Sequence, residues 1–475
     1  MKRMIGMFVL IMLYTIGTGQ TNVSPTLTLK QAVETALVNN LDVKQRDLQM
    51  QSAEANWKQS KSDRFPTLAG VANHGSNQGR SIDPFTNSFI NQTVNYASYG
   101  LNSGVTLFNG LGIWNNIKAN ALGYAAAKWE LEQEKDNLTL NVILAYLQLL
   151  TNTDLLERTR NTTTVTRKQL DRLEIMNKQG AIAPALLFDL RGQLASDEVA
   201  LIDNVNALNA SRLLLSQLMN VPFSTELMVE RLPIDQFNTE YPATVEDIYT
   251  IALQKLSVIK ATSLRTQSAE KALKAAKGDF YPSLGLSGQI TTNYSNAAFR
   301  DILINTTEGP TDNYVVVNGT KTPVIATQNN FSSEKIKFND QLDNNLFTSI
   351  NLGLRIPLFN NLVTRTRVRQ AEITRKSFEN IEQTTKIQLK QNIEQAYFNM
   401  IAARDRYKAL LEQFNAFGES FRAAEVRFAA GASTSVEYII AKNNVDRVNS
   451  NLISARYDYL LRTKILDYYQ GKPLW

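Results

Sequence analysis

The feature that most constrains the fold of this chain is an internal repeat. Residues 28–68 match residues 244–284 without a gap, with 14 of 41 positions identical. A second ungapped match joins 107–222 to 358–473, so that Leu107-Phe108-Asn109 recurs as Leu358-Phe359-Asn360. A repeat of this length indicates one supersecondary unit used twice. We divide the chain into repeat one (about 27–222), a linker (223–243) and repeat two (about 244–473).

Each repeat predicts a short helix, a strand pair and a long helical hairpin. Pro66 and Pro282 end the first helices, and Thr28 is a candidate N-cap for the first of them. Gly180 and Gly431 end the long helices. At 68 residues each, these would be about 100 Å long. The expected helices are Leu29–Asp63, Leu111–Lys178, Pro184–Met219, Val245–Asp279, Leu362–Ala429 and Ser435–Tyr469.

The second long helix carries an apolar seam whose steps alternate between four and three residues. This spacing is the heptad pattern of a coiled coil. The seam comprises Leu389, Ile393, Ala396, Met400, Ala403, Tyr407, Leu410, Phe414, Phe417, Phe421, Ala424 and Phe428.

Four segments alternate apolar with small or polar residues, as β-strands with two unlike faces do. They lie at about 66–73, 98–108, 282–292 and 347–359. Phe65, Phe108, Tyr281 and Phe359 stand at their helix-proximal ends, as in an interfacial aromatic girdle. A half-buried sheet in a soluble protein is the alternative. Two polar segments, 73–95 and 294–345, are expected to be loops on the outside of a membrane.

The N-terminus has the order of a secretory signal. Lys2 and Arg3 precede an apolar run from Met4 to Ile16, and small residues follow. We therefore expect a signal peptide over residues 1–19. The alternative is an anchor, but 13 residues are short for a membrane span of about 20. With no later run of 18 apolar residues, any membrane crossing would be made by β-strands.

Composition excludes several kinds of site. The chain has no Cys and one His, His74, so thiolate metal sites, Cys nucleophiles and a Ser-His-Asp triad are not expected. The net charge of +6 is spread along the chain, which argues against nucleic-acid binding. We find no catalytic, metal or cofactor site and predict that the protein is not an enzyme.

Four strands cannot close a barrel, and an open edge in lipid leaves backbone groups unpaired. The chain must therefore associate if the strands enter a membrane. Two copies would supply eight strands and three copies twelve, and only twelve leave an open lumen.

Three motifs stand at the ends of the expected helices: Gln179-Gly180-Ala181-Ile182, the run from Phe428-Ala429-Ala430-Gly431 through Glu437, and Gln470-Gly471-Lys472-Pro473. In this order, with the two-copy plan, they resemble the TolC-type outer membrane efflux proteins, the outer membrane factor family. The resemblance covers about 27–473. It implies a mostly α fold with a membrane β-barrel: a homotrimer with a twelve-stranded β-barrel, a twelve-helix α-barrel in the periplasm and an equatorial domain.

The same resemblance implies an outer-membrane channel of a tripartite efflux or type I secretion system. Such a channel is a passive duct opened by a periplasmic adaptor and an inner-membrane pump of the RND or ABC type. Its adaptor-contact candidates are Gly180, Ala181, Ile182, Gly431, Ala432 and Ser433. Plain turn geometry is the alternative role for the glycines.

The resemblance places a periplasmic gate at Glu437, Ile440 and Phe428. Glu437 matches an acidic constriction position, whereas Ile440, Ser433 and Phe428 replace an acidic, a basic and a tyrosine residue of the family pattern. An apolar constriction is therefore a second form of the gate. A solvated charge at a helix start is the alternative role for Glu437.

Two other classes of protein compete with the channel. A periplasmic adaptor is also exported and coiled-coil rich, but it carries one helical hairpin within β-domains. A structural or adhesive coiled coil does not explain the aromatic-ended strands. The cargo is left open among drugs, ions and proteins.

Overall fold

The computed structural model describes residues 26–82, 87–231, 241–472 and 474. The expected signal peptide (1–19), part of the expected linker (232–240) and Pro473 lie outside the described residues. The chain forms two compact units. We call Met1–Met50, Ala126–Ser263 and Ile381–Trp475 the helical unit, and Gln51–Ala125 and Leu264–Asn380 the sheet unit.

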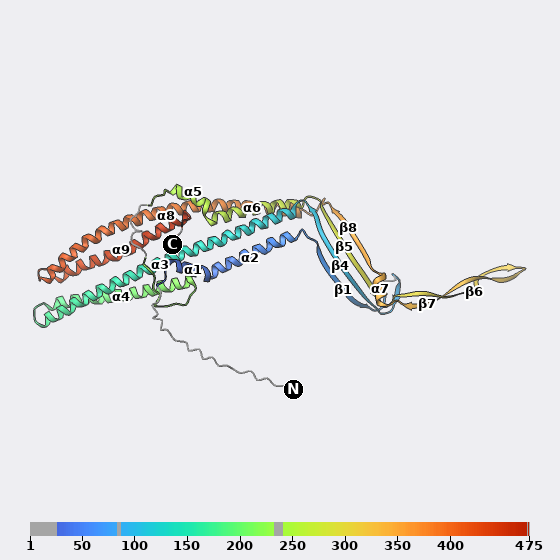
Figure 1. The fold of residues 1–475 in the computed structure, drawn as a ribbon, viewed down its shortest axis with the longest axis horizontal. Helices are drawn as coiled ribbons and strands as arrows, with labels where there is room; N and C mark the ends of the chain where they lie inside the picture. The colour runs from blue at the N-terminus through green and yellow to red at the C-terminus, as the bar shows by residue number, and fades with distance from the viewer. Residues whose placement is uncertain (1–25, 83–86, 232–240, 473, 475) are drawn as a thin grey trace, which may run out of the picture. The chain divides into compact units, whose positions relative to one another are not determined.

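Among the described residues, the helical unit holds the greater part of two antiparallel helical hairpins and the helical segments within 29–50 and 245–263. The hairpins are α3 (Gly112–Lys178) with α4 (Pro184–Met219), and α8 (Val363–Ala429) with α9 (Ser435–Tyr469) (Figure 1). One apolar core contains Tyr146 and Leu215, and a second contains Ile393, Met400 and Leu466. The N-terminal part of the predicted seam on α8, from Leu389 to Ala403, therefore faces the second core, as a coiled-coil seam should.

The linker joins the start of the chain beside the first core. Leu27 pairs with Val229 in an isolated parallel bridge. Tyr146 is fully buried, and its single hydroxyl proton is shared between the carbonyl oxygens of Leu27 at 2.9 Å and Glu230 at 2.8 Å. One buried tyrosine thus fixes two backbone segments that are distant in sequence.

The first helix of each repeat was expected to be continuous, and this expectation is wrong. The chain forms α1 (Leu29–Asn39) and α2 (Leu41–Ser62), then α5 (Val245–Lys255) and α6 (Ser257–Gly278). Asn40 and Leu256, 216 residues apart, adopt extended backbone angles. The Asn40 side chain accepts a hydrogen bond from the N–H of Asp42 at 2.9 Å and so caps α2. Thr28 caps α1 as predicted, and Thr244 caps α5 in the same way.

The sheet unit holds a four-stranded antiparallel sheet in the order β1-β4-β5-β8. Its strands are β1 (Thr67–Asn77), β4 (Val94–Asn109), β5 (Ser283–Ser295) and β8 (Phe347–Arg355). In the part of the chain that the structure describes, β1 and β8 each pair on one side only. The sheet therefore has two open edges.

The register gives the sheet two unlike faces. Leu101 pairs with Ile290, and Leu286 pairs with Leu352, so these side chains share one face. Leu352 is 65% exposed and Ile350 is 77% exposed. The other face is mostly small or polar; its residues include Asn102, Gly104, Ser287, Gln289, Asn351 and Gly353.

Two expectations about this unit need correction. The last strand ends at Arg355, so residues 356–359 are not strand; Pro357, which has no N–H, lies two residues further on. The two polar segments are not only loops. The first contains β2 (Arg80–Ile82) and β3 (Phe89–Asn91), and the second contains β6 (Phe299–Val317), β7 (Thr320–Lys335) and α7 (Phe338–Asn344).

The step from strand to long helix uses the same backbone twice. Gly110 and Leu111 have φ of 64° and 63°, and Asn361 and Leu362 have φ of 53° and 64°. At Gly110 a Cβ would lie 2.4 Å from the carbonyl oxygen of Gly278, so this position requires glycine for space as well as for conformation. Among the described helices, none has a stretch long and apolar enough to cross a membrane.

Candidate functional site at the tips of the helical hairpins

The turns of the two hairpins are built alike. The N–H of Gly180 bonds to the carbonyl of Asn177 at 2.9 Å, and that of Ala181 bonds to Met176 at 2.9 Å. The N–H groups of Gly431 and Ala432 make the equivalent bonds at 3.1 and 2.8 Å. These are Schellman motifs, in which the glycine takes the left-handed conformation. The two glycines have φ of 71° and 72°, so turn geometry by itself accounts for glycine at both positions.

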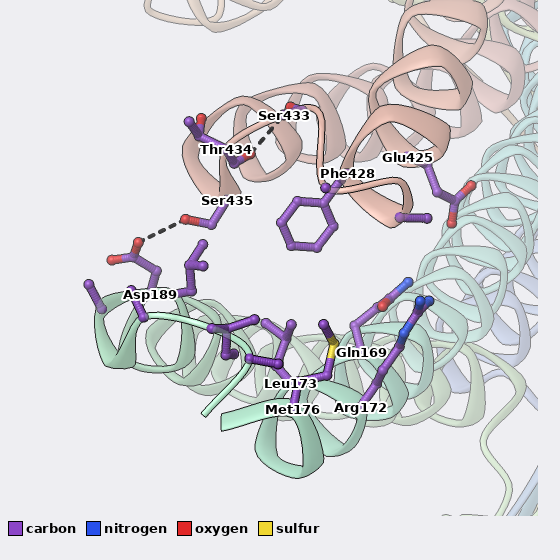
Figure 2. Close-up of a pocket in the computed structure, with 17 residues that line it drawn as sticks. Gln169, Arg172, Leu173, Met176, Asp189, Glu425, Phe428, Ser433, Thr434 and Ser435 are labelled. Atoms are coloured by element: carbon purple, nitrogen blue, oxygen red, sulfur yellow. Dashed lines mark hydrogen bonds between the residues drawn. The ribbon is translucent and has the colours of Figure 1, made fainter. Parts of the chain in front are cut away.

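A cavity of about 620 Å³ opens between the two turns (Figure 2). Phe428 points into it from α8, opposite Leu173 and Met176 of α3. Across the cavity the Ser435 hydroxyl donates a hydrogen bond to the Asp189 carboxylate at 3.0 Å. The cavity is thus lined by apolar side chains of α3 and α8, and a hydrogen bond beside it joins α4 to the start of α9.

The structure brings only some of the predicted tip residues together. Ala181, Ile182, Gly431, Ser433 and Phe428 line the cavity. Gly180 and Ala432 are exposed at the turns beside it. Ile182 is half-buried against the apolar cluster of Leu173 and Leu190, which leaves the turn residues as the more accessible part of the predicted contact.

Glu437 lies in the first turn of α9, where its N–H bonds to the Thr434 hydroxyl at 3.2 Å. Its carboxylate accepts a hydrogen bond from Ser433 at 2.9 Å and pairs with Arg427 at 3.6 Å. Sequence reasoning missed Arg427. The sequence signal for Arg427 was its position in the last turn of α8, because the helix dipole favours a cation there. The dipole of α9 likewise favours the anionic Glu437 in its first turn.

The other two gate candidates have different surroundings. Ile440 is 56% exposed, on the first turns of α9. Phe428 is half-buried and stacks on Tyr438 with ring centroids 4.8 Å apart. Phe428 therefore packs inside its own chain, whereas Ile440 and Glu437 are open to a neighbour.

Further along the hairpins from the turns lies a buried cluster of charged side chains, which was not predicted from the sequence. Lys442 on α9 is 3% exposed and contacts Asp197 of α4 at 3.0 Å and Asp446 at 2.9 Å. Arg158 of α3 pairs with Asp446. Thr166 donates to Asp197 at 2.5 Å. Two cations and two carboxylates balance in charge, so the cluster joins three helices without leaving an unpaired buried ion.

Tyr438 lies next to this cluster, and its burial shifts the pKa of its side chain. Burial raises the pKa of the Tyr438 phenol to about 12. Within the described residues, its hydroxyl oxygen has no hydrogen-bond partner. The same residues contain no group of three His, Cys, Asp or Glu side chains that could hold a metal ion.

The profile of the outer membrane efflux protein family matches residues 32–221 and 248–468. The chain therefore belongs to the outer membrane efflux protein family. This membership confirms the predicted location in the cell outer membrane, with helices that project into the periplasm, and the role in efflux transport. The family is one of outer-membrane channels and not of enzymes.

Solved structures share the fold at low sequence identity. The chain is similar to CusC (17% identity, TM-score 0.75, covering 94% of this chain and 92% of that one). It is also similar to the outer membrane protein VceC of Vibrio cholerae (15%, 0.74, 94% and 96%). A third is the CmeC outer membrane channel of Campylobacter jejuni (16%, 0.73, 93% and 85%). No curated protein sequence matches the chain.

Proposed function

We propose that three copies of this chain form a passive export duct, a twelve-stranded β-barrel continued by a twelve-helix α-barrel. The observation that carries the proposal is the sheet, which has an exposed apolar face and two open edges. In lipid each unpaired backbone group on those edges would cost several kcal/mol. Pairing β8 of one copy with β1 of the next removes both edges, and the antiparallel order continues around the ring.

The two-copy plan of the chain supports the same proposal. The extended breaks at Asn40 and Leu256, and the left-handed pairs that begin α3 and α8, recur at the repeat spacing. Each of the two repeats within the chain therefore supplies two strands and one long hairpin. Three chains then place six similar units around one axis, as closed symmetry favours.

Cysteine pairs across the sheet edges test the association, because the native chain has no Cys. Ala69→Cys on β1 would be combined in turn with Ser349→Cys, Asn351→Cys or Gly353→Cys on β8. All four positions lie on the polar face, so the thiols meet if β8 and β1 of neighbouring copies pair. We expect one combination to give a ladder of up to three linked chains. A monomer with no cross-link from any combination would overturn the proposal.

We further propose that the helical hairpins dock a periplasmic adaptor, which opens the duct toward an inner-membrane pump of the RND or ABC type. The exposed turns at Gly180-Ala181 and Gly431-Ala432, with Ile182 and Ser433 beside them, form the proposed contact. Gly431→Asn keeps a residue that tolerates the left-handed conformation but adds a side chain. Chemical cross-linking of the variant to the adaptor measures the contact. If the trimer stays intact but no longer cross-links to the adaptor, the turn contacts the adaptor. If cross-linking is unchanged, Gly431 serves only the geometry of the turn.

The proposed gate consists of Glu437 and Ile440, with Phe428 holding the turn from inside through Tyr438. Three Glu437 carboxylates around one axis would attract cations and repel one another. Glu437→Gln is expected to lower the cation selectivity of the channel several-fold in planar bilayers. Glu419→Gln, an exposed glutamate on the same hairpin, is the matched control. Unchanged selectivity in Glu437→Gln would exclude the carboxylate ring and leave the apolar form of the gate.

A further inference from the structure

The β6–β7 hairpin is an exposed arm whose base is fixed. Figure 1 shows it leaving the end of the sheet where α7 lies. The amide of Gln341, which is fully buried, accepts a hydrogen bond from the N–H of Ser295 at 2.8 Å. It donates to the carbonyls of Ser295 at 3.0 Å and Ile336 at 2.9 Å. One side chain thus ties both ends of the arm to the end of β5, so the base of the arm is fixed to the sheet.

The arm carries an apolar stripe on one face. β7 alternates regularly, and its residues pair in register with β6, so Phe331 faces the same way as Leu303, and Ile325 the same way as Pro310. The stripe comprises Phe299, Leu303, Pro310, Tyr314, Val316, Pro323, Ile325 and Phe331. The other face has no aromatic side chain. It carries Asn, Gln, Ser and Thr, for example Asn305 opposite Asn330, together with the smaller apolar residues Ile302, Val315, Val317 and Val324.

The stripe has no cover within the chain. Its Phe, Leu, Tyr, Val and Ile side chains are between 49% and 66% exposed. A lone two-stranded hairpin is marginally stable in water, and large apolar side chains gathered on one exposed face mark an interaction site. The arm therefore needs a partner on this face.

We propose that this partner is the same stripe on the other copies of the chain, so that the β6–β7 arms pack together around the axis of the assembly. The inference rests on the proposed trimer. Because every arm is fixed to the end of its own sheet, closing the sheets into a ring brings the arms side by side. A two-stranded ribbon twists strongly, and three identical stripes can wind around one axis without a separate groove.

The stripe does not suit a lipid surface. Asp301 and Glu308 lie on the same face between the apolar residues. Charges on a lipid-facing strand are unfavourable. Between arms in water, these carboxylates can stay at the hydrated margin while the two apolar clusters on either side make contact.

Neighbouring positions on β7 give a matched test. Phe331→Cys places the only thiol of the chain in the stripe, and Ser332→Cys places it on the opposite face one residue away. After treatment of outer membranes with a short bis-maleimide, we expect linked pairs of the chain from Phe331→Cys at least about tenfold above those from Ser332→Cys. Both variants must label equally after denaturation.

The sheet-edge cysteine pair separates the two proposals. If that pair links but Phe331→Cys does not, the arms stand apart, and the inference fails while the trimer remains. If Phe331→Cys links to a chain of different mass, another protein covers the stripe and the inference is wrong. If neither links and the protein is a monomer, both proposals fall. As a second variant, Leu303→Asp with Phe331→Asp should lower the temperature at which the trimer dissociates, and an unchanged temperature would contradict packing of the arms.

Discussion

Lys442 is the residue on which the packing of α3, α4 and α9 most depends. Its side chain is 3% exposed, and its ammonium group is held between Asp197 and Asp446. Lys442→Met removes the cation and leaves Asp197 buried with no opposite charge. We expect a loss of about 3–5 kcal/mol in the free energy of unfolding. Guanidinium unfolding of the helical circular-dichroism signal in detergent measures it.

Lys408→Met is the control, because Lys408 is exposed on α8. That change should stay within about 0.5 kcal/mol. Adding Asp197→Leu to Lys442→Met should recover part of the loss, since no buried charge would then lack a partner there. Equal effects of Lys442→Met and Lys408→Met would contradict the assigned role.

Two buried tyrosines should respond in opposite ways to the loss of a hydroxyl. Tyr438 has no hydrogen-bond partner for its hydroxyl among the described residues, whereas the Tyr457 hydroxyl donates to Asp154 at 2.8 Å. Tyr438→Phe is expected to stabilise the protein by about 1 kcal/mol, and Tyr457→Phe to destabilise it by about 1.5–3 kcal/mol. Thermal unfolding of the two variants side by side decides, and changes of the same sign would contradict the prediction.

The raised pKa of Tyr438 also predicts a dependence on alkaline pH. Burial raises the pKa from 10.0 to about 12, so the folded state holds its proton where the unfolded state has lost it. Folding stability should therefore fall as pH rises from about 10 to about 12. In Tyr438→Phe this fall should be smaller, as equilibrium unfolding across that range would show; an identical slope would count against it.

The sequence could not have predicted the buried charge cluster of Lys442, Asp197, Asp446 and Arg158. The periodicity of α9 predicts an apolar seam through Ala441, Val445 and Val448, and Lys442 adjoins it. The partner Asp197 is 245 residues away in the chain, and local periodicity carries no information on such a pairing. Gly180 and Gly431 were different, because a glycine after a long helix signals its own turn.

At the scale of elements, the two faces of the sheet make a direct prediction. Leu352 belongs to the exposed apolar face and Asn351 to the polar one. Leu352→Arg is expected to cost about 2–4 kcal/mol in the membrane and to reduce the assembled protein in outer-membrane fractions. Asn351→Arg should be tolerated. If both variants assemble equally well, the apolar face does not meet lipid.

Helices and strands were predictable to different degrees. The long helices follow from an absence of proline and from regular apolar spacing. The breaks at Asn40 and Leu256 do not, because neither proline nor glycine marks them. The β6–β7 arm was expected to be a loop, since its run of Asn, Ser and Thr hides the alternation that its register reveals.

At the scale of the whole molecule, the sequence predicted the family through an ordered set of motifs, and the family profile confirms it. The proposed association rests on a physical argument, because a four-stranded sheet with open edges would leave backbone groups unpaired in lipid. The number of copies does not follow from the chain alone, since both eight and twelve strands close a ring.

The central claim is that copies of this chain form a conducting channel. It is tested most directly by native mass and planar-bilayer conductance, measured on one purified preparation in detergent. We predict a complex of three chains that produces discrete conductance steps, which disappear when heat separates the chains. A stable monomer, or a trimer that inserts without conductance under any voltage or after Glu437→Gln with Ile440→Ala, would contradict the claim.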